Sequence, residues 1–186
     1  MSDLPSLLRR VRAALGRAEH APPPDVPSVP PALRPAVAEE LLGAFIANAR
    51  RAGAEVMETA DPEAVIADLA PAPARVYREG QLWGCLPFEL DLAIVRATIA
   101  VAASGTVGLA HRDTEHLAAM ATPLLLVQLD PAHIVATIGD ALARLKATAL
   151  PPTRVFMTGP SKTADIEGIL VTGVHGPGRL VIVIDR

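Results

Sequence analysis

The chain has 186 residues, a formal net charge of −3 at pH 7, and hydrophobic residues at 51% of its positions. This length fits one domain with a substantial core, and the hydrophobic content excludes a disordered chain. The net charge and the 3% aromatic content disfavour nucleic-acid binding, which needs cations and stacking side chains. Apolar runs such as 124–127 and 180–184 are too short to span a bilayer, and arginines interrupt the N-terminal apolar positions. We therefore expect a cytoplasmic protein.

Cys85 is the only cysteine. A single thiol cannot close a disulfide within the chain, hold an iron–sulfur cluster or build a Cys-rich zinc site. We therefore expect no cofactor in this chain, and any redox centre that it works with must lie in another protein. Cys85 as a nucleophile is an alternative, but a lone thiol more often serves as a small buried apolar residue.

The first 35 residues are typical of an arm attached to a domain. Apolar residues at helical spacing predict an amphipathic helix that ends near Gly16: Leu4, Leu7, Leu8, Val11 and Leu15. The proline-rich stretch 22–35 cannot form a regular helix or a central strand, so we expect an extended linker. The predicted division is an arm and linker at 1–35 and an α/β domain at 36–186. The helix either packs on its own domain or docks on a partner subunit.

Helical and strand patterns alternate through the domain. Helices are expected at 41–49, from Pro62 after a capping Asp61, from Pro131 with Ile134, Ile138, Leu142 and Leu145 on one stripe, and over 164–170. Strands are expected at 55–57, 75–77, 98–101, 107–109, 124–129, 155–157 and 180–184, whereas 82–95 is ambiguous. The run 124–129 hardly alternates, which is typical of a strand covered on both faces. This order predicts a three-layer α/β/α domain with a mostly parallel sheet.

The segment 158–167 is the strongest candidate for a ligand site. It follows one predicted strand and precedes a predicted helix, where unpaired N–H groups and the helix dipole favour an anion. Lys162 adds a cation, and Ser161 and Thr163 add hydroxyls. The simpler alternative is helix capping with a solvated lysine. Asp165 in the first turn favours this alternative, because acids there complement the dipole and oppose an anionic ligand.

Further polar residues lie in loops that contain glycine or proline. The Ser104-Gly105-Thr106 turn offers backbone amides to a ligand, or is only a tight connection between strands. His175 is held in a glycine-rich loop and titrates near neutral pH, or it satisfies loop carbonyls. The histidines and acids of 111–116 lack the spacing of a zinc motif, so we expect no metal site there, although Arg112 is a candidate ligand clamp. His133 is expected on the surface.

We expect these loops to converge on one cleft, because ligands gather beyond the carboxyl ends of parallel strands. His175 is the best candidate for proton transfer. The expected ligand-binding residues are Ser104, Gly105, Thr106, Arg112, Ser161, Lys162, Thr163, Asp165 and His175. Walker, Gly-x-Gly-x-x-Gly, Gly-x-Ser-x-Gly and His-Glu-x-x-His motifs are absent from the sequence.

Several stretches resemble the LUD-domain family, in particular its members that take part in lactate utilization. The most specific is Gly-Pro-Ser-Lys-Thr-Ala-Asp-Ile-Glu at 159–167, followed by Leu-Val at 170–171 and Gly-Val-His-Gly-Pro at 173–177. The opening helix at 7–17, the 104–106 turn and the segment 131–135 are also similar. The chain departs at two positions, where an acid common before the turn is Ala103 and an Asp common slightly earlier is Thr98.

The resemblance implies a fold like that of the CoA-transferases and ribose-5-phosphate isomerase. It also implies a role in oxidising L-lactate to pyruvate with two iron–sulfur partner proteins, a division of labour with which the single cysteine agrees. The alternative is an independent enzyme or binding protein for a small phosphorylated, CoA-bearing or carboxylate ligand. The missing acids at Thr98 and Ala103 disfavour isomerase-type base chemistry. Whether the chain itself catalyses a step stays open.

Overall fold

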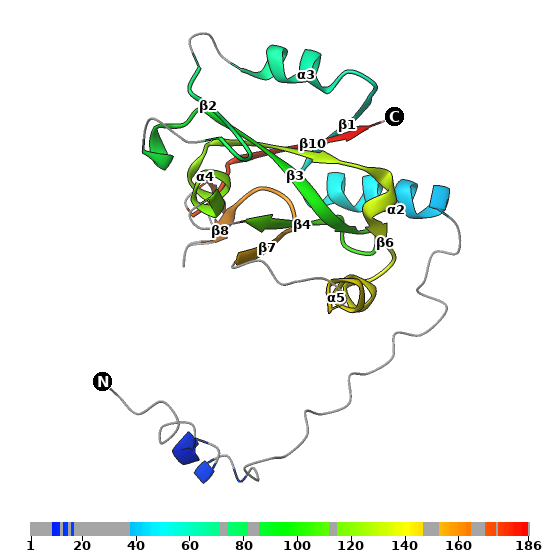
Figure 1. Ribbon diagram of the computed structural model, residues 1–186, viewed down its shortest axis with the longest axis vertical. Helices are drawn as coiled ribbons and strands as arrows, with labels where there is room; N and C mark the ends of the chain where they lie inside the picture. The colour runs from blue at the N-terminus through cyan, green and yellow to red at the C-terminus, as the bar shows by residue number, and fades with distance from the viewer. Residues whose placement is uncertain are drawn as a thin grey trace.

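The computed structural model describes residues 9–11, 13, 14, 16, 38–70, 74–81, 86–111, 115–146, 153–164, 170–173 and 175–185. Its body has helices on both sides of a sheet (Figure 1). Residues 9–11, 13 and 14 are helical. The linker lies outside the described residues, so the docking of the N-terminal helix stays a prediction. None of the described helices is long and apolar enough to cross a membrane.

The helices and strands alternate along the chain. In order they are α2 (Ala38–Arg51), β1 (Glu55–Thr59), α3 (Pro62–Leu69), β2 (Val76–Arg78), the 3₁₀ turn η2 (Pro87–Glu89), β3 (Leu92–Val101), β4 (Thr106–His111), α4 (Glu115–Ala121), β5 (Leu124–Leu129), the 3₁₀ turn η3 (Pro131–His133), β6 (Ile134–Val135), α5 (Ile138–Lys146), β7 (Thr153–Met157), β8 (Lys162–Ala164), β9 (Leu170–Thr172) and β10 (Arg179–Asp185). The predicted α/β class is therefore confirmed.

The main sheet is mostly parallel. Among the described residues its order is β1-β10-β5-β3-β4-β7, with β2 and β6 each pairing with β3. Strands β1, β10, β5, β3 and β2 run parallel, whereas β4 is antiparallel to β3 and β7 is antiparallel to β4. Strand β10 lies between β1 and β5, and its residues 180–184 are all buried, as the uninterrupted apolar run predicts.

Helices cover the two faces of the sheet in different ways. On one face, α2 and α4 cover a continuous core through Phe45, Ala49, Ala118 and Ala119. The other face carries two separate clusters. Ile66 of α3 covers one of them, and Ala141 and Leu145 of α5 cover the other. The two faces and their helices make the three layers. On the face that carries α3 and α5, no described helix covers the sheet between these two.

The start of α3 agrees with its sequence signals. Asp61 caps the helix, because its Oδ1 accepts a hydrogen bond from the Ala64 N–H at 3.1 Å. Pro62 at the first helical position lacks a donor, which costs nothing there because the first N–H groups of a helix have no partner within it. Cap and proline together fix where the helix begins, directly after β1.

The predicted helix over 164–170 is wrong at both ends. Ala164 lies in β8 and Leu170 in β9, and these two strands pair antiparallel; residues 165–169 lie outside the described residues. Thr163, Val171 and Thr172 are β-branched, which favours strands over helices. The 158–164 segment therefore leads into a strand pair, and Ser161 is followed directly by strand β8 rather than by the first turn of a helix.

The predicted helix from Pro131 is also wrong in its first half. Residues 131–133 form a 3₁₀ turn capped by Asp130, and Ile134–Val135 is a short strand that pairs with β3. Helix α5 begins only at Ile138. The hydroxyl of the preceding residue, Thr137, accepts a hydrogen bond from the Asp140 N–H at 3.2 Å. The β-branched residues Ile134 and Val135 thus form a short strand beside β3, and Thr137 marks the start of helix α5. Ile138 and Leu142, expected on a buried stripe, are 48% and 49% exposed.

The ion pair between β10 and β1 gives a testable pH dependence. The Arg179 guanidinium donates to both oxygens of the Glu55 carboxylate, at 2.6 and 2.8 Å. These hydrogen bonds and the positive charge lower the pKa of Glu55 in the folded state. Because both side chains are nearly half exposed, Glu55→Gln should lower the free energy of unfolding at neutral pH by only about 0.2–1 kcal/mol.

A carboxylate whose pKa is lower in the folded state stabilises the fold at pH values above its unfolded-state pKa of about 4.3. This stabilisation is lost as the pH falls through the lower folded-state pKa. The difference between wild type and Glu55→Gln in urea unfolding should therefore shrink from neutral pH towards about pH 3. Asp68→Asn, which changes an exposed carboxylate on α3, is the control. A difference that stays constant with pH would contradict the assignment.

Candidate functional site

Arg96 and Thr98 are the two exposed residues of β3, whose other residues are buried. Both lie on the face that α3 and α5 cover, but in the stretch between these helices. The pairing of β3 with β4 shifts register between Ala97 and Ile99, which marks a β-bulge at Thr98. The bulge places Thr98 and Ile99 on the same face. The exposed residues Arg96 and Thr98 are therefore followed directly by Ile99, which belongs to the apolar cluster under α5.

The neighbouring parallel strands carry polar residues on the same face near their carboxyl ends. Gln128 of β5 lies directly beside Arg96 in the register, and β2 and β10 end with Arg78 and Asp185. Each follows an apolar residue of the α3-covered cluster by two positions, so strand alternation places it on that face. The apolar residues are Val76, Leu126 and Val183.

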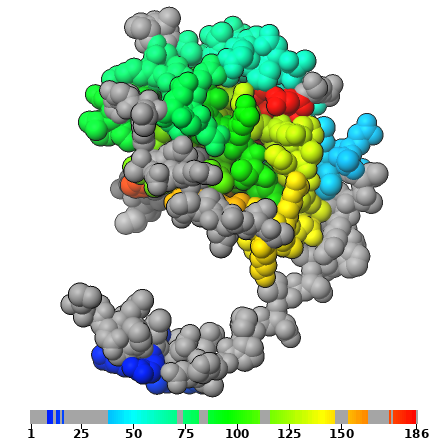
Figure 2. Space-filling model, viewed as in Figure 1, coloured from blue at the N-terminus to red at the C-terminus, as the bar shows by residue number. Residues whose placement is uncertain are grey.

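These residues line a cleft of about 1230 Å³, here called the carboxyl-end cleft. Its wall comprises Glu63, Arg78, Glu79, Arg96, Thr98, Gln128, Asp130, His133 and Asp185, together with Pro62, Gln81, Ile94 and Ala97. Figure 2 shows the green surface of the β2–β3 region between α3 at the top and the yellow α5 below. Open parallel sheets bind their ligands at this position, beyond the carboxyl ends of the strands.

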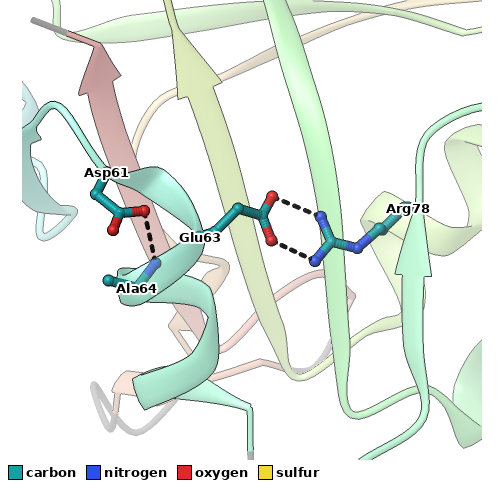
Figure 3. Close-up of polar contacts among 4 residues, drawn as sticks. All are labelled: Asp61, Glu63, Ala64 and Arg78. Atoms are coloured by element: carbon teal, nitrogen blue, oxygen red, sulfur yellow. Dashed lines mark hydrogen bonds and ion pairs between the residues drawn. The ribbon is translucent and has the colours of Figure 1, made fainter.

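The two arginines of the cleft differ in their partners. The Arg78 guanidinium donates to both Glu63 oxygens, at 2.9 and 2.8 Å (Figure 3). This contact lowers the pKa of Glu63 and raises that of Arg78. The backbone N–H of Arg96 donates to the Glu79 carboxylate at 2.9 Å. The guanidinium of Arg96, however, has no hydrogen bond or ion pair to the described residues. Among the described residues, no side chain neutralises the Arg96 guanidinium.

His133 is oriented by the backbone of β3. Its Nδ1 lies 3.2 Å from the Ala97 carbonyl oxygen. Because a carbonyl only accepts hydrogen bonds, this contact places the proton on Nδ1, and in the neutral ring Nε2 is then an acceptor. The predicted surface position is only partly right, because His133 is half-buried and lines the cleft.

A second, smaller cavity of about 420 Å³ contains three of the residues that the sequence singled out, and is here called the Lys162 pocket. Ser161, Lys162 and His175 line it, with Ala52, Met120, residues 155–160, Gly176 and Pro177. Lys162 Nζ donates to the Ala52 carbonyl oxygen at 3.2 Å, near the C-terminal end of α2. A cation there complements the helix dipole, so Lys162 has a structural role beside any role in binding.

The backbone of Ser161 joins the two loops of the Lys162 pocket. Its N–H donates to the Pro177 carbonyl oxygen at 2.8 Å, and its carbonyl oxygen accepts from the Gly173 N–H at 3.0 Å. The His175 side chain is exposed. Thr163 belongs to β8, and only its backbone is described; Cys85, Arg112 and Asp165 lie outside the described residues.

The Ser104–Thr106 turn lines neither cavity. The Ser104 and Thr106 hydroxyls lie 2.6 Å apart, and the Thr106 hydroxyl lies 2.6 Å from that of Thr158. The turn is thus joined to the start of the Lys162 segment. Gly105 is buried at φ +66° against the backbone of Ala49 in α2. The glycine therefore allows close packing against helix α2 rather than against a ligand.

The sequence analysis missed Arg96, Gln128 and Asp185. Each is a single polar residue in or directly after an apolar run, and the strands that carry them are far apart in the sequence. The available signal was local, because Gln128 interrupts the otherwise apolar run 124–129. Within the described part of the chain, no group of three or more His, Cys, Asp or Glu side chains is placed to hold a metal ion.

Comparisons with known proteins agree on one family. The family model of the LUD domain matches residues 87–184. Lactate utilization protein C of Geobacillus kaustophilus is 34% identical over 106 residues, and that of Geobacillus thermodenitrificans is 33% identical over 106 residues. Each match covers 53% of this chain and 44% of the relative, so it spans less than half of these relatives. A crystal structure of a DUF162 family protein from Deinococcus radiodurans superposes with a TM-score of 0.62 at 17% identity, over 82% of this chain and all of that one, and shares the fold.

The contact between Gly105 and α2 predicts a large loss of stability on substitution. A Cβ at this position would enter the backbone of Asn48 and Ala49, and it would also be strained by the positive φ. Gly105→Ala should therefore lower the free energy of unfolding by about 2–4 kcal/mol, measured by urea unfolding. Gly80→Ala is the matched control, because Gly80 has φ +81° with open space around it and should lose only about 1–2 kcal/mol. Equal losses for both would show that the α2 contact contributes nothing.

Proposed function

Because the chain belongs to the LUD-domain family, whose family model matches residues 87–184, we propose that it takes part in lactate utilization. The observation that carries this proposal is its similarity to lactate utilization protein C of two Geobacillus species. The matched region contains β3 and β5, which supply Arg96 and Gln128 to the carboxyl-end cleft, and it also contains His133. It therefore includes part of the cleft wall, whereas Glu63, Arg78 and Glu79 precede it and Asp185 follows it.

The proposed role is that of a cluster-free subunit in the oxidation of L-lactate to pyruvate. With Cys85 as its only cysteine, the chain lacks the thiolates that a cysteine-ligated iron–sulfur cluster needs. Iron–sulfur partner proteins carry the electrons in this scheme, and this chain contributes a polar cleft for a small molecule. It acts in a complex with those partners.

A second candidate function is that of an independent enzyme or binding protein for a small phosphorylated, CoA-bearing or carboxylate ligand. The size of the carboxyl-end cleft and the unneutralised Arg96 in it favour this candidate. A ligand that binds only the folded state raises the melting temperature by mass action. Thermal shifts with sugar phosphates, acyl-CoA and carboxylic acids separate this candidate from a purely scaffolding role.

Deleting the gene in its host should slow growth on L-lactate as the only carbon source and leave growth on pyruvate unchanged. An affinity-tagged copy should restore growth and co-purify with a protein that has the visible absorbance of an iron–sulfur cluster. Growth on pyruvate is the control, because it bypasses the oxidation step. Unchanged growth on L-lactate, together with no cluster-containing partner, would contradict the proposed function.

A further inference from the structure

We propose that the carboxyl-end cleft binds a small 2-hydroxycarboxylate. In this assignment the Arg96 guanidinium and the Gln128 amide bind the carboxylate, and His133 Nε2 accepts a hydrogen bond from the hydroxyl. The choice of L-lactate as the probe rests on the proposed function, whereas the site and the ligand class rest on the residues of the cleft.

Arg96 and Gln128 form a donor pair on adjacent parallel strands. They are register partners, so their backbones lie about 4.8 Å apart and their side chains leave the same face of the sheet. A guanidinium donates two parallel hydrogen bonds to a carboxylate, and a glutamine amide adds a further donor. Gln128 is half-buried in the floor of the cleft beside the exposed Arg96.

The other charged groups of the cleft explain why Arg96 is the anchor. Arg78 is held by both oxygens of Glu63, so its charge is already neutralised. The Glu79 carboxylate accepts from the Arg96 backbone N–H, and Asp130 Oδ1 accepts from the Ala132 N–H at 2.8 Å. Arg96 is therefore the cation of the described cleft whose donors are free for a ligand.

The acids restrict the ligand to a single negative charge. Asp185 lines the same cleft on β10, which is separated from β3 by β5, and its carboxylate has no hydrogen bond or ion pair to the described residues. With Glu79 and Asp130 also in the wall, a second anionic group on the ligand would meet like charges. A monocarboxylate fits this charge pattern, and a phosphate ester or dicarboxylate does not.

His133 supplies the part of the site that distinguishes a hydroxy acid from a simple acid. Its ring is hydrogen-bonded to the carbonyl oxygen of Ala97, the residue after Arg96. The imidazole therefore lies beside the proposed carboxylate position. Nε2 is its remaining polar atom, and as an acceptor it pairs with a ligand hydroxyl. A ligand without that hydroxyl leaves this atom without a partner, which lowers its affinity.

The test is a calorimetric or NMR titration of the full chain with L-lactate and with propionate, which has the carboxylate but lacks the hydroxyl. Wild type should bind L-lactate with roughly millimolar affinity and propionate about two- to tenfold more weakly. Arg96→Ala and Arg96→Gln should weaken both acids by about tenfold or more. His133→Ala should weaken L-lactate to the level of propionate and leave propionate unchanged, as a double-mutant cycle requires.

Lys146→Ala is the matched control, since it removes an exposed cation of α5 that lines neither cavity and should leave both affinities unchanged. Lys162→Ala tests the Lys162 pocket as the competing site. Arg96 is exposed, so its variants should melt close to the wild type, which checks that they fold. The proposal is overturned if L-lactate does not bind at tens of millimolar, if Arg96→Ala binds it normally, if Lys162→Ala abolishes binding, or if a phosphate ester binds more tightly. These outcomes are separate from the growth test: lost growth without lactate binding refutes only this site, and Arg96-dependent binding without a growth defect refutes only the proposed function.

Discussion

Strand β3 changes its pairing partners halfway along its length, and this change determines both the strand order of the sheet and the position of the cleft. Its first half lies between the parallel strands β2 and β5, and its second half pairs with the antiparallel β4 and the short β6. The bulge at Thr98 accommodates this change. A strand without the extra residue would reverse the facing of every side chain beyond it, whereas with the bulge Ala97 and Ala100 both stay in the core under α2 and α4.

The same geometry leaves a gap on the opposite face. Helix α3 covers β3 as far as Ile94, and α5 covers it again from Ile99. Arg96 and Thr98 lie in the uncovered stretch. An unneutralised arginine in a central strand contributes little to the fold, and departures from local consistency of this kind are expected at functional sites. Thr98, one of the two positions at which the sequence analysis expects a departure from the family pattern, lies in the cleft wall.

Much of the fold follows from local sequence signals. The strands predicted at 124–129 and 180–184 are confirmed as β5 and β10, because burial on both faces leaves uninterrupted apolar runs. The Asp61–Pro62 pair marks the start of α3. The errors arose where a short pattern fits two structures. Ile134 matches a helical stripe but pairs with β3, and the Ala164–Leu170 spacing fits a helix although both residues lie in strands.

The candidate site was harder to predict because its parts are brought together only by tertiary structure. Arg78, Arg96, Gln128 and Asp185 come from four strands, and none forms a local motif with the others. The contact of Lys162 could not be predicted, because the Ala52 carbonyl to which it donates is 110 residues away. The ligand-binding roles assigned from the sequence stay predictions: Ser104, Gly105, Thr106, Arg112, Ser161, Lys162, Thr163, Asp165 and His175.

The central claim is that the exposed stretch of β3 between α3 and α5 is the ligand site of this domain. The most direct measurement is residue-resolved ¹H–¹⁵N NMR of the full chain during a titration with L-lactate. We predict saturable shifts concentrated at the backbone amides of 96–98, 128–130, 132 and 133 and at the His133 ring, with little change at 159, 161 and 162. Shifts concentrated at 159–162 and His175, or the absence of saturable shifts anywhere, would contradict the account.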